Sequence, residues 1–273
     1  MFEKTGPKTS LQSVFAISEL VYHSIVRKVR KKHGNALMSI LLNMMQTAIL
    51  VLVFYLMFSV LGMRGAALRG DFLLYLMTGI FNFMTHTKTM GAVAAAEGPA
   101  SPMMKHAPMN TAIAILAAAI GTLYIQMLSL FSILFIYHVA ITPIVVDDPV
   151  NAIGMVLLSW FTGAGVGLVL LSIKPWYPNF VQLMTTIYAR ANMIASGKMF
   201  VANTLPSFML AMFDWNPLFH TIDQARGYTF INYVPRNSTT DYPLYVGLAL
   251  LVIGMMGEFF TRRQASLSWG SKR

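Results

Sequence analysis

The sequence predicts an all-α membrane protein with six transmembrane helices. Three observations predict this class. Of the 273 residues 56% are hydrophobic, and only 11% are charged, whereas a soluble domain carries about 25% charged residues. The apolar residues also gather in several long runs, and about 20 such residues are enough for a helix to cross a bilayer.

Residues 1–38 are expected to form a cytosolic segment that contains an amphipathic helix. Between residues 10 and 33 apolar side chains recur every three or four positions, which is the period of one helix face. Such a helix lies along a membrane surface with its cationic end among anionic headgroups. The alternative is a cytosolic helix packed on its own protein. The basic residues predicted to contact the membrane surface are Arg27, Lys28, Arg30 and Lys31.

Residues 39–261 are expected to hold the six spans, and a basic tail follows at residues 262–273. An even number of crossings places both termini on one side, and the basic residues at both ends place that side in the cytoplasm. The fifth span is the least apolar. The expected spans are Ser39–Gly62, Phe72–Ala96, Thr111–Tyr137, Asn151–Ile173, Asn179–Lys198 and Leu244–Thr261.

Two connecting segments differ from simple loops. Residues 97–110, EGPASPMMKHAPMN, are predicted to lie in the cytosol as a brief helix bracketed by prolines. Residues 199–243 are predicted to lie outside. Their first part, MFVANTLPSFMLAMF, is apolar but too short to cross, so we expect it to enter the outer leaflet and return. Asp214 or Asn216 is then expected to cap a short helix, with Pro217 in its first turn.

The motifs of an enzyme or a metal site are missing from the sequence. It has no cysteine, no GxxxxGK[ST] loop, no HExxH pair and no GxSxG elbow. We therefore predict no catalytic residue, no metal and no cofactor in this chain. The run GAGVG at 163–167 superficially suggests a nucleotide loop, but it lies inside an apolar span, so Gly163 and Gly167 are interpreted as a helix-packing face.

Three ionisable residues lie inside the predicted spans, where charge is costly and commonly functional. Arg190 lies near the middle of the fifth span, so it either faces an aqueous path that carries anions or pairs with a neighbouring helix. Lys88 is close enough to the cytosolic end of its span to extend its ammonium toward water. Glu258 is expected to pair with Arg262.

The segment WNPLFHTIDQARGYTF at 215–230 carries a resemblance to a known family. It is similar to the Asn-Pro-Leu-x-His segment, followed by a hydrophobic residue and an Arg, of the capsular polysaccharide export permeases. The whole layout resembles the permease subunit of a type 2 ATP-binding cassette (ABC) exporter, and the O-antigen and teichoic acid exporter permeases share this layout. From the residues alone, the acids of the segment and Arg226 are expected to pair locally or face water.

The resemblance implies a transport subunit in the bacterial inner membrane. Two copies would form the channel, and separate ATPase subunits that bind ATP and Mg would drive it. The substrate would be a lipid-linked and commonly acidic polysaccharide, and periplasmic and outer-membrane export proteins are possible further partners. The segment 97–110 would couple to the ATPase through Glu97, Pro102, Met103, Met104, Lys105 and His106. The residues predicted to line the channel are Arg190, Tyr188, Tyr55, Phe81, Trp160, Phe213, Trp215 and Phe219.

Several alternatives stay open. Most of the aromatic rings are equally well explained by an interfacial belt and by core packing. A permease of the same superfamily for O-antigen, teichoic acid or a hydrophobic small molecule fits the same sequence. An ion-coupled transporter is disfavoured because no span carries a pair of mid-membrane acids. A membrane-embedded transferase is disfavoured because the adjacent acids Asp147 and Asp148 fall on the outer side. The basic net charge sits beside the spans, so nucleic-acid binding is not expected.

Overall fold

The computed structural model describes residues 18–26, 36–60, 62, 71–97 and 110–270. Throughout these residues the regular structure is helical, and none of them forms a strand. Residues 18–26 are helical and precede the bundle. The helices of the bundle are α2 (Ala36–Val60), α3 (Phe72–Ala94), α4 (Thr111–Ala140), α5 (Pro149–Ile173), α6 (Pro178–Ala195), η2 (Ala202–Thr204), α7 (Ser207–Phe213), α8 (Pro217–Thr229) and α9 (Asp241–Gly270).

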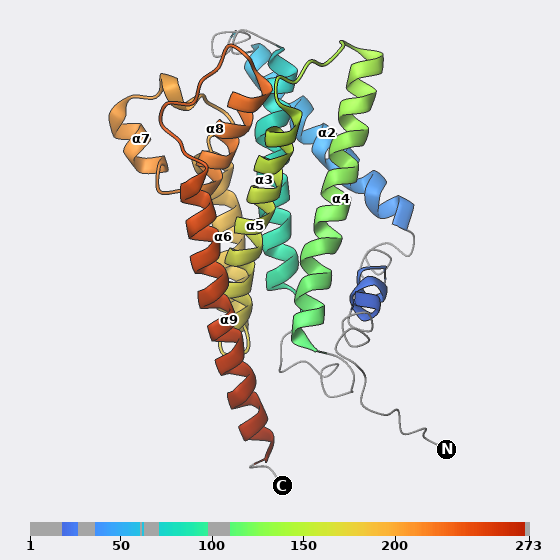
Figure 1. The fold of residues 1–273 in the computed structure, drawn as a ribbon, viewed down its shortest axis with the longest axis vertical. Coiled ribbons are helices and arrows are strands. Elements are labelled where there is room, and N and C mark those ends of the chain that lie inside the picture. Colours follow the sequence, from blue (N-terminus) through green and yellow to red (C-terminus); the bar gives the residue numbers. More distant parts are fainter. Residues whose placement is uncertain (1–17, 27–35, 61, 63–70, 98–109, 271–273) are drawn as a thin grey trace.

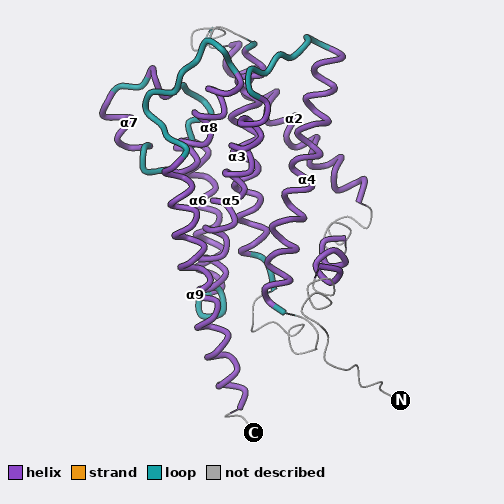
Figure 2. The backbone as a smooth tube through the Cα atoms, viewed as in Figure 1, coloured by secondary structure: helices purple, strands orange, loops and turns teal. Residues whose placement is uncertain are grey.

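The long helices alternate in direction along the chain. Figure 1 shows α3, α5 and α9 running from the end of the bundle that carries α8 toward the opposite end, while α4 and α6 run the other way. Helix α2 runs toward the α8 end at a marked tilt. Figure 2 shows that the longer described loops gather at the same end as α7 and α8, whereas α5 and α6 are joined by a short turn at the other end.

Helices occupy all six ranges that the sequence predicts as spans. Four of them, α2, α4, α5 and α9, are long and apolar enough to cross a membrane, which indicates a membrane protein. Helix α3 carries a polar run from Thr85 to Thr89, and α6 carries Gln182, Arg190 and Asn192, so these two helices are less apolar. Six crossings therefore stay a prediction.

The ends of the helices are capped by side chains. Asp71 accepts a hydrogen bond from Leu73 N (2.9 Å) at the start of α3, and Asp148 accepts one from Asn151 N (3.0 Å) at the start of α5. At the opposite end, Lys174 Nζ donates to Ala94 O at the end of α3 (3.1 Å). Burial lowers the pKa of Lys174. These caps satisfy main-chain groups that have no partner inside their own helix.

Glycines bring α5 into main-chain contact with α3. A Cβ atom on Gly163 would lie 2.4 Å from His86 O, and one on Gly167 would lie 2.7 Å from Met90 O. The predicted GxxxG packing face is therefore confirmed. Because 163 faces 86 and 167 faces 90, the two helices run parallel at this contact.

A second set of glycines brings α9 against the other side of α5. A Cβ atom on Gly247 would lie 2.6 Å from the ring of Phe161, and one on Gly254 would lie 2.8 Å from Leu168 Cγ. Helix α5 is thus packed between α3 and α9, with small residues on both of its contact faces, the arrangement that lets membrane helices approach closely.

Gly163→Ala tests the α3–α5 contact. We expect it to lower the free energy of unfolding by about 1–3 kcal/mol, because the new methyl group would meet a main-chain oxygen that cannot move aside. Thermal unfolding of the purified protein in a lipid nanodisc would measure the change.

Gly154→Ala is the matched control, since it lies on the same helix and a Cβ atom there meets nothing within 4 Å. We expect it to be neutral or mildly stabilising, because alanine favours the helix over glycine. Equal stability of the two variants would contradict the close contact.

Candidate functional site

The segment 213–230 that stands out in the sequence folds as α8 with its two flanks. Helix α8 lies at one end of the bundle against α3, α5 and α9 (Figure 1), and most of its residues are buried, including Phe219, Asp223 and Arg226. The expectation that the acids of this segment and Arg226 pair locally or face water is therefore wrong for Asp223 and Arg226. Both are at most 2% exposed.

Asn216 begins α8 and ties it to α6. Its side chain accepts a hydrogen bond from Leu218 N (3.0 Å), so it is the N-cap, and Pro217 follows at the first helical position. The predicted cap is confirmed at Asn216. Its amide group also donates to Asn192 Oδ1 (2.8 Å) and Ala195 O (3.1 Å) at the end of α6. One side chain thus joins the start of α8 to the end of α6.

Arg226, near the other end of α8, also joins this helix to the turn that follows α6. Its Nη1 donates to Gly197 O (2.9 Å) and Phe200 O (2.6 Å), and its Nη2 donates to Lys198 O (2.8 Å). The guanidinium lies over the ring of Tyr75 on α3, 4.1 Å from its centroid. The turn that follows α6 therefore receives from Arg226 the hydrogen bonds that the end of a helix lacks.

Gly79 and Gly197 make room for this arrangement. A Cβ atom on Gly79 of α3 would lie 3.0 Å from Arg226 Nη2 and 2.9 Å from Lys198 Cβ. Gly197 has a φ of +77°, in the left-handed region that favours glycine. Lys198 is 1% exposed, and its ammonium lies over the ring of Phe83, 3.7 Å from the centroid. A cation–π contact with Phe83 thus stabilises this buried ammonium.

Asp223 fastens the loop that follows α8. Its carboxylate accepts hydrogen bonds from the Tyr233 hydroxyl and from Ser238 Oγ (2.7 Å). Burial raises the pKa of Tyr233, and the neighbouring Asp223 charge raises it further. His220 Nδ1 accepts from Thr239 N (3.0 Å), so Nε2 carries the proton and donates to Asp214 O (2.6 Å). The hydrogen bonds of these polar residues therefore stabilise the fold at this end of the bundle rather than form a reactive centre.

A buried histidine that the sequence does not single out joins α3, α5 and α6. His86 is fully buried, and its Nδ1 lies 3.1 Å from Ser159 O. A carbonyl oxygen only accepts, so Nδ1 carries the proton and Nε2 accepts from the Tyr188 hydroxyl (3.0 Å). The two rings also stack at 5.8 Å. The polar run inside a predicted span was the available signal for His86.

The polar contacts continue from α5 to α3 and α8. Ser159 Oγ lies 2.9 Å from Asn82 Oδ1 and 2.8 Å from Thr221 Oγ1.

A separate polar cluster joins α2, α3 and α4. Lys88 is partly exposed and donates to Asn43 and, at 2.8 Å, to Gln46, both on α2. That its ammonium extends toward water stays a prediction. Side-chain hydrogen bonds between helices of this kind help to hold membrane helices together.

Glu258 also differs from its prediction. Thr111 Oγ1 donates to Glu258 Oε1 (2.5 Å), which links the start of α4 to the C-terminal half of α9. Arg262 is exposed one turn further along, and among the described residues it forms no ion pair with Glu258. Glu258 thus bonds to the hydroxyl of Thr111 on α4 instead of to the expected Arg262.

The residues predicted to line a channel are spread over the bundle. Phe81 and Phe219 are buried, whereas Trp215 and Arg190 are exposed. The rings of Phe213 and Phe219 lie 6.5 Å apart, and Phe213 also packs against Phe200. The structure thus brings Phe213 and Phe219 together and leaves Trp215 and Arg190 on the surface.

The other rings of that set contact different helices. Tyr188 lies on His86, as described above. Trp160 Nε1 donates to Ala119 O on α4 (2.8 Å), and the Tyr55 ring lies 6.3 Å from that of Phe72. Their role in a channel stays a prediction.

The predicted coupling and membrane-surface residues fall mainly outside the described part of the chain. Glu97 is described and is partly buried just beyond the end of α3. The other coupling residues, Pro102, Met103, Met104, Lys105 and His106, and the basic residues Arg27, Lys28, Arg30 and Lys31 lie outside the described residues.

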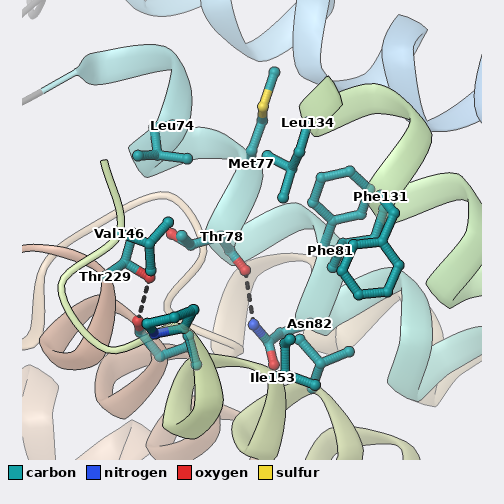
Figure 3. A pocket seen from close by; sticks show the side chains of 15 residues that line it. Leu74, Met77, Thr78, Phe81, Asn82, Phe131, Leu134, Val146, Ile153 and Thr229 are labelled. Carbon is teal, nitrogen blue, oxygen red and sulfur yellow. Dashed lines mark hydrogen bonds between the residues drawn. The ribbon is translucent and has the colours of Figure 1, made fainter. Parts of the chain in front are cut away.

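A cavity of about 150 Å³ lies between α3, α4, α5 and α8. Figure 3 shows Leu74, Met77 and Phe81 of α3 facing Leu134 and Phe131 of α4 across it, with Ile153 of α5 on a further side. Its lining is almost entirely apolar. Among the described residues no group of three or more His, Asp or Glu side chains could hold a metal ion.

Comparison with known proteins adds no relative. No protein-family model matches the chain, and no curated protein matches it.

Arg226→Gln tests the junction between α6 and α8. We expect it to lower the free energy of unfolding by roughly 3 kcal/mol, because three main-chain carbonyls lose a charged donor inside the protein. Thermal unfolding in nanodiscs would report the loss. Arg190→Gln is the matched control, since Arg190 is exposed on α6. A stability of Arg226→Gln equal to that of Arg190→Gln would show that the buried bonds contribute little.

Proposed function

We propose that this chain is the membrane-spanning subunit of an ABC exporter that moves a lipid-linked, acidic capsular polysaccharide across the bacterial inner membrane. One observation carries the proposal. The segment 215–230, whose sequence resembles that of capsular polysaccharide export permeases, is a capped helix built into one end of a bundle of alternating long helices. Two copies would enclose the channel, and separate ATPase subunits would supply the energy.

The topology follows from the alternation of the helices. Counting α3 and α6 with the four long apolar helices gives six crossings, with the start of α2 and the end of α9 on the same side. We place that side in the cytoplasm because the basic residues flank it. The end with α7 and α8 is then outside. Phe208 and Met212 of α7 are 68% and 59% exposed, which suits a short helix that enters the outer leaflet.

The exposed surface of α6 is consistent with a second copy or a substrate lying beside this helix. The buried residues of α6 are Val181 and Asn192, and the helix is too polar to count among the long apolar helices. The exposed surface of α6 includes large apolar side chains such as Phe180 and Leu183, but a charged group on it is costly in lipid. Arg190 lies on its exposed surface. We propose that this surface faces the path of an anionic polymer.

The other members of the same superfamily fit the same geometry. A permease for O-antigen, teichoic acid or a hydrophobic small molecule would use the same bundle and the same external drive. Neighbouring genes would separate these possibilities cheaply, because capsule glycosyltransferases and an ATPase gene are expected beside a capsule exporter. A secondary transporter and a membrane-embedded transferase are less well supported, for the reasons given by the sequence.

The segment 97–110 is predicted to dock on the ATPase, and Met104→Asp with Lys105→Asp tests this. We expect the double variant to lose co-purification with the ATPase and to lower the ATP turnover of the complex at least about tenfold, because two new carboxylates at an apolar and cationic contact are costly to bury. A pull-down and a phosphate-release assay would measure both.

Ser271→Asp with Lys272→Asp is the matched control, because it makes the same change in net charge in the tail. We expect it to leave the complex intact. An unchanged complex in the Met104 and Lys105 variant would remove the coupling assignment. ATP hydrolysis by the purified chain alone would count against the whole proposal.

Arg190→Ala tests the path of the polymer. We expect surface polymer to fall at least about tenfold while polymer accumulates inside the cell, because an anion in a low-dielectric path loses a compensating charge. Immunoblots of surface and intracellular polymer would measure this. Arg190→Lys should retain a large part of export, since it keeps the charge. Normal export of an acidic polymer by Arg190→Ala would assign Arg190 to another role.

A further inference from the structure

We propose that the cavity between α3, α4, α5 and α8 binds a short stretch in the middle of one acyl chain of a membrane phospholipid, which enters from the lipid side between α4 and α5. This inference goes beyond the proposed export function and does not depend on which substrate is moved. It rests on the chemistry of the lining, the size of the space and the side on which it opens.

The lining offers a ligand almost no polar group. Three of its side chains are polar, and all three are used inside the protein. Thr78 Oγ1 donates to Tyr75 O (2.8 Å). Figure 3 shows the other two bonds, from Asn82 Nδ2 to Thr78 O (2.9 Å) and from Thr229 Oγ1 to Ala225 O (2.7 Å). The remaining lining residues are Leu74, Met77, Phe81, Leu130, Phe131, Leu134, Val146, Pro149, Ala152, Ile153, Val156 and Ala225.

Such a space is unfavourable for water. A water molecule is stable inside a protein when it makes about two to four hydrogen bonds, and apolar cavities of about 150 Å³ stay dry and accept benzene-sized apolar groups. The cavity here has about that volume. A few methylene groups of an acyl chain therefore match both its size and its chemistry, and each of them gains dispersion contacts when it moves from loosely packed lipid into the closely packed cavity.

The cavity is partly open to the exterior. Its most exposed lining residues are Phe131 of α4, which is 52% exposed, and Pro149 at the start of α5. On the same helix as Phe131, the apolar residues Phe135 and Ile136 are also largely exposed. Because α4 and α5 are both long and apolar enough to span a membrane, an opening between them is reached from hydrocarbon.

The position of the cavity makes it accessible to the lipids of one leaflet. Val146 and Pro149 lie just beside Asp147 and Asp148, and the two main-chain N–H groups of those acids bond to Thr229 O and Tyr228 O at the end of α8. The cavity thus lies near the α8 end of α4 and α5. A phospholipid of the leaflet on this side has its headgroup at the level of these acids and its chain beside the opening.

Photolabelling tests the site directly. The full chain is reconstituted in vesicles of phosphatidylethanolamine and phosphatidylglycerol that contain a trace of phosphatidylethanolamine with a diazirine in the middle of one acyl chain. Mass spectrometry then maps the labelled residues. We expect label on buried lining residues such as Leu130 and Val156, in addition to the exposed lipid-facing residues. Label restricted to exposed residues such as Phe135 would overturn the proposal.

Ile153→Trp, which fills the cavity, should reduce the buried label at least about tenfold, since losing the contacts of about two methylene groups is enough for that change. Leu157→Trp is the matched control, because it lies one turn away on α5, is 41% exposed and does not line the cavity. Ala152→Leu is a milder filling change if Ile153→Trp fails to fold. Buried label that persists in a folded filling variant would contradict the site, and the wild-type map decides by itself if neither variant folds.

Discussion

The α8 end of the bundle depends on the hydrogen bonds that Arg226 donates to the main chain at Gly197, Lys198 and Phe200. The chain must reverse there, directly after α6, inside the protein, where a buried carbonyl without a donor is costly. One guanidinium supplies donors to three carbonyls and stacks on Tyr75 at the same time. Asn216 holds the other end of α8 to Asn192 and Ala195, so α6 and α8 are joined at two points. Gly79 leaves room for this arrangement, because a Cβ atom there would lie 2.9 Å from Lys198 Cβ and 3.0 Å from Arg226 Nη2.

The sequence predicted those features whose cause is local. The helix ranges follow from runs of apolar residues, the Gly163–Gly167 contact from the spacing of small residues, and the Asn216 cap from the Asn-Pro pair at a helix start. The partners of Arg226 and Asp223 could not be predicted in this way. Arg226 binds carbonyl groups, which every residue has, and Asp223 binds two hydroxyls that the chain brings back after a loop. A charged residue in a polar stretch looks exposed until the fold is known. The polar run in its predicted span pointed to His86, but its partners could not be predicted, since they are a carbonyl of α5 and a hydroxyl of α6.

Helix α6 matters both for the packing of the bundle and for the proposed function. It is attached to the rest of the bundle through Tyr188 and Asn192, both of which bond to buried polar groups of other helices. Most of its remaining surface is exposed and includes Arg190. Specific polar contacts thus orient this helix, although it buries little apolar area of its own. A fixed orientation matters for a helix proposed to line a path, because the side chains that meet a passing polymer are then determined by the bundle rather than by the polymer.

The glycines on both sides of α5 have a mechanical consequence. A Cβ atom on Gly163 or Gly167 would meet the main chain of α3, and one on Gly247 or Gly254 would meet side chains of α5, so α3, α5 and α9 are in close contact. Because closely packed interiors have low compressibility and transmit strain, we expect these three helices to move together as one rigid unit.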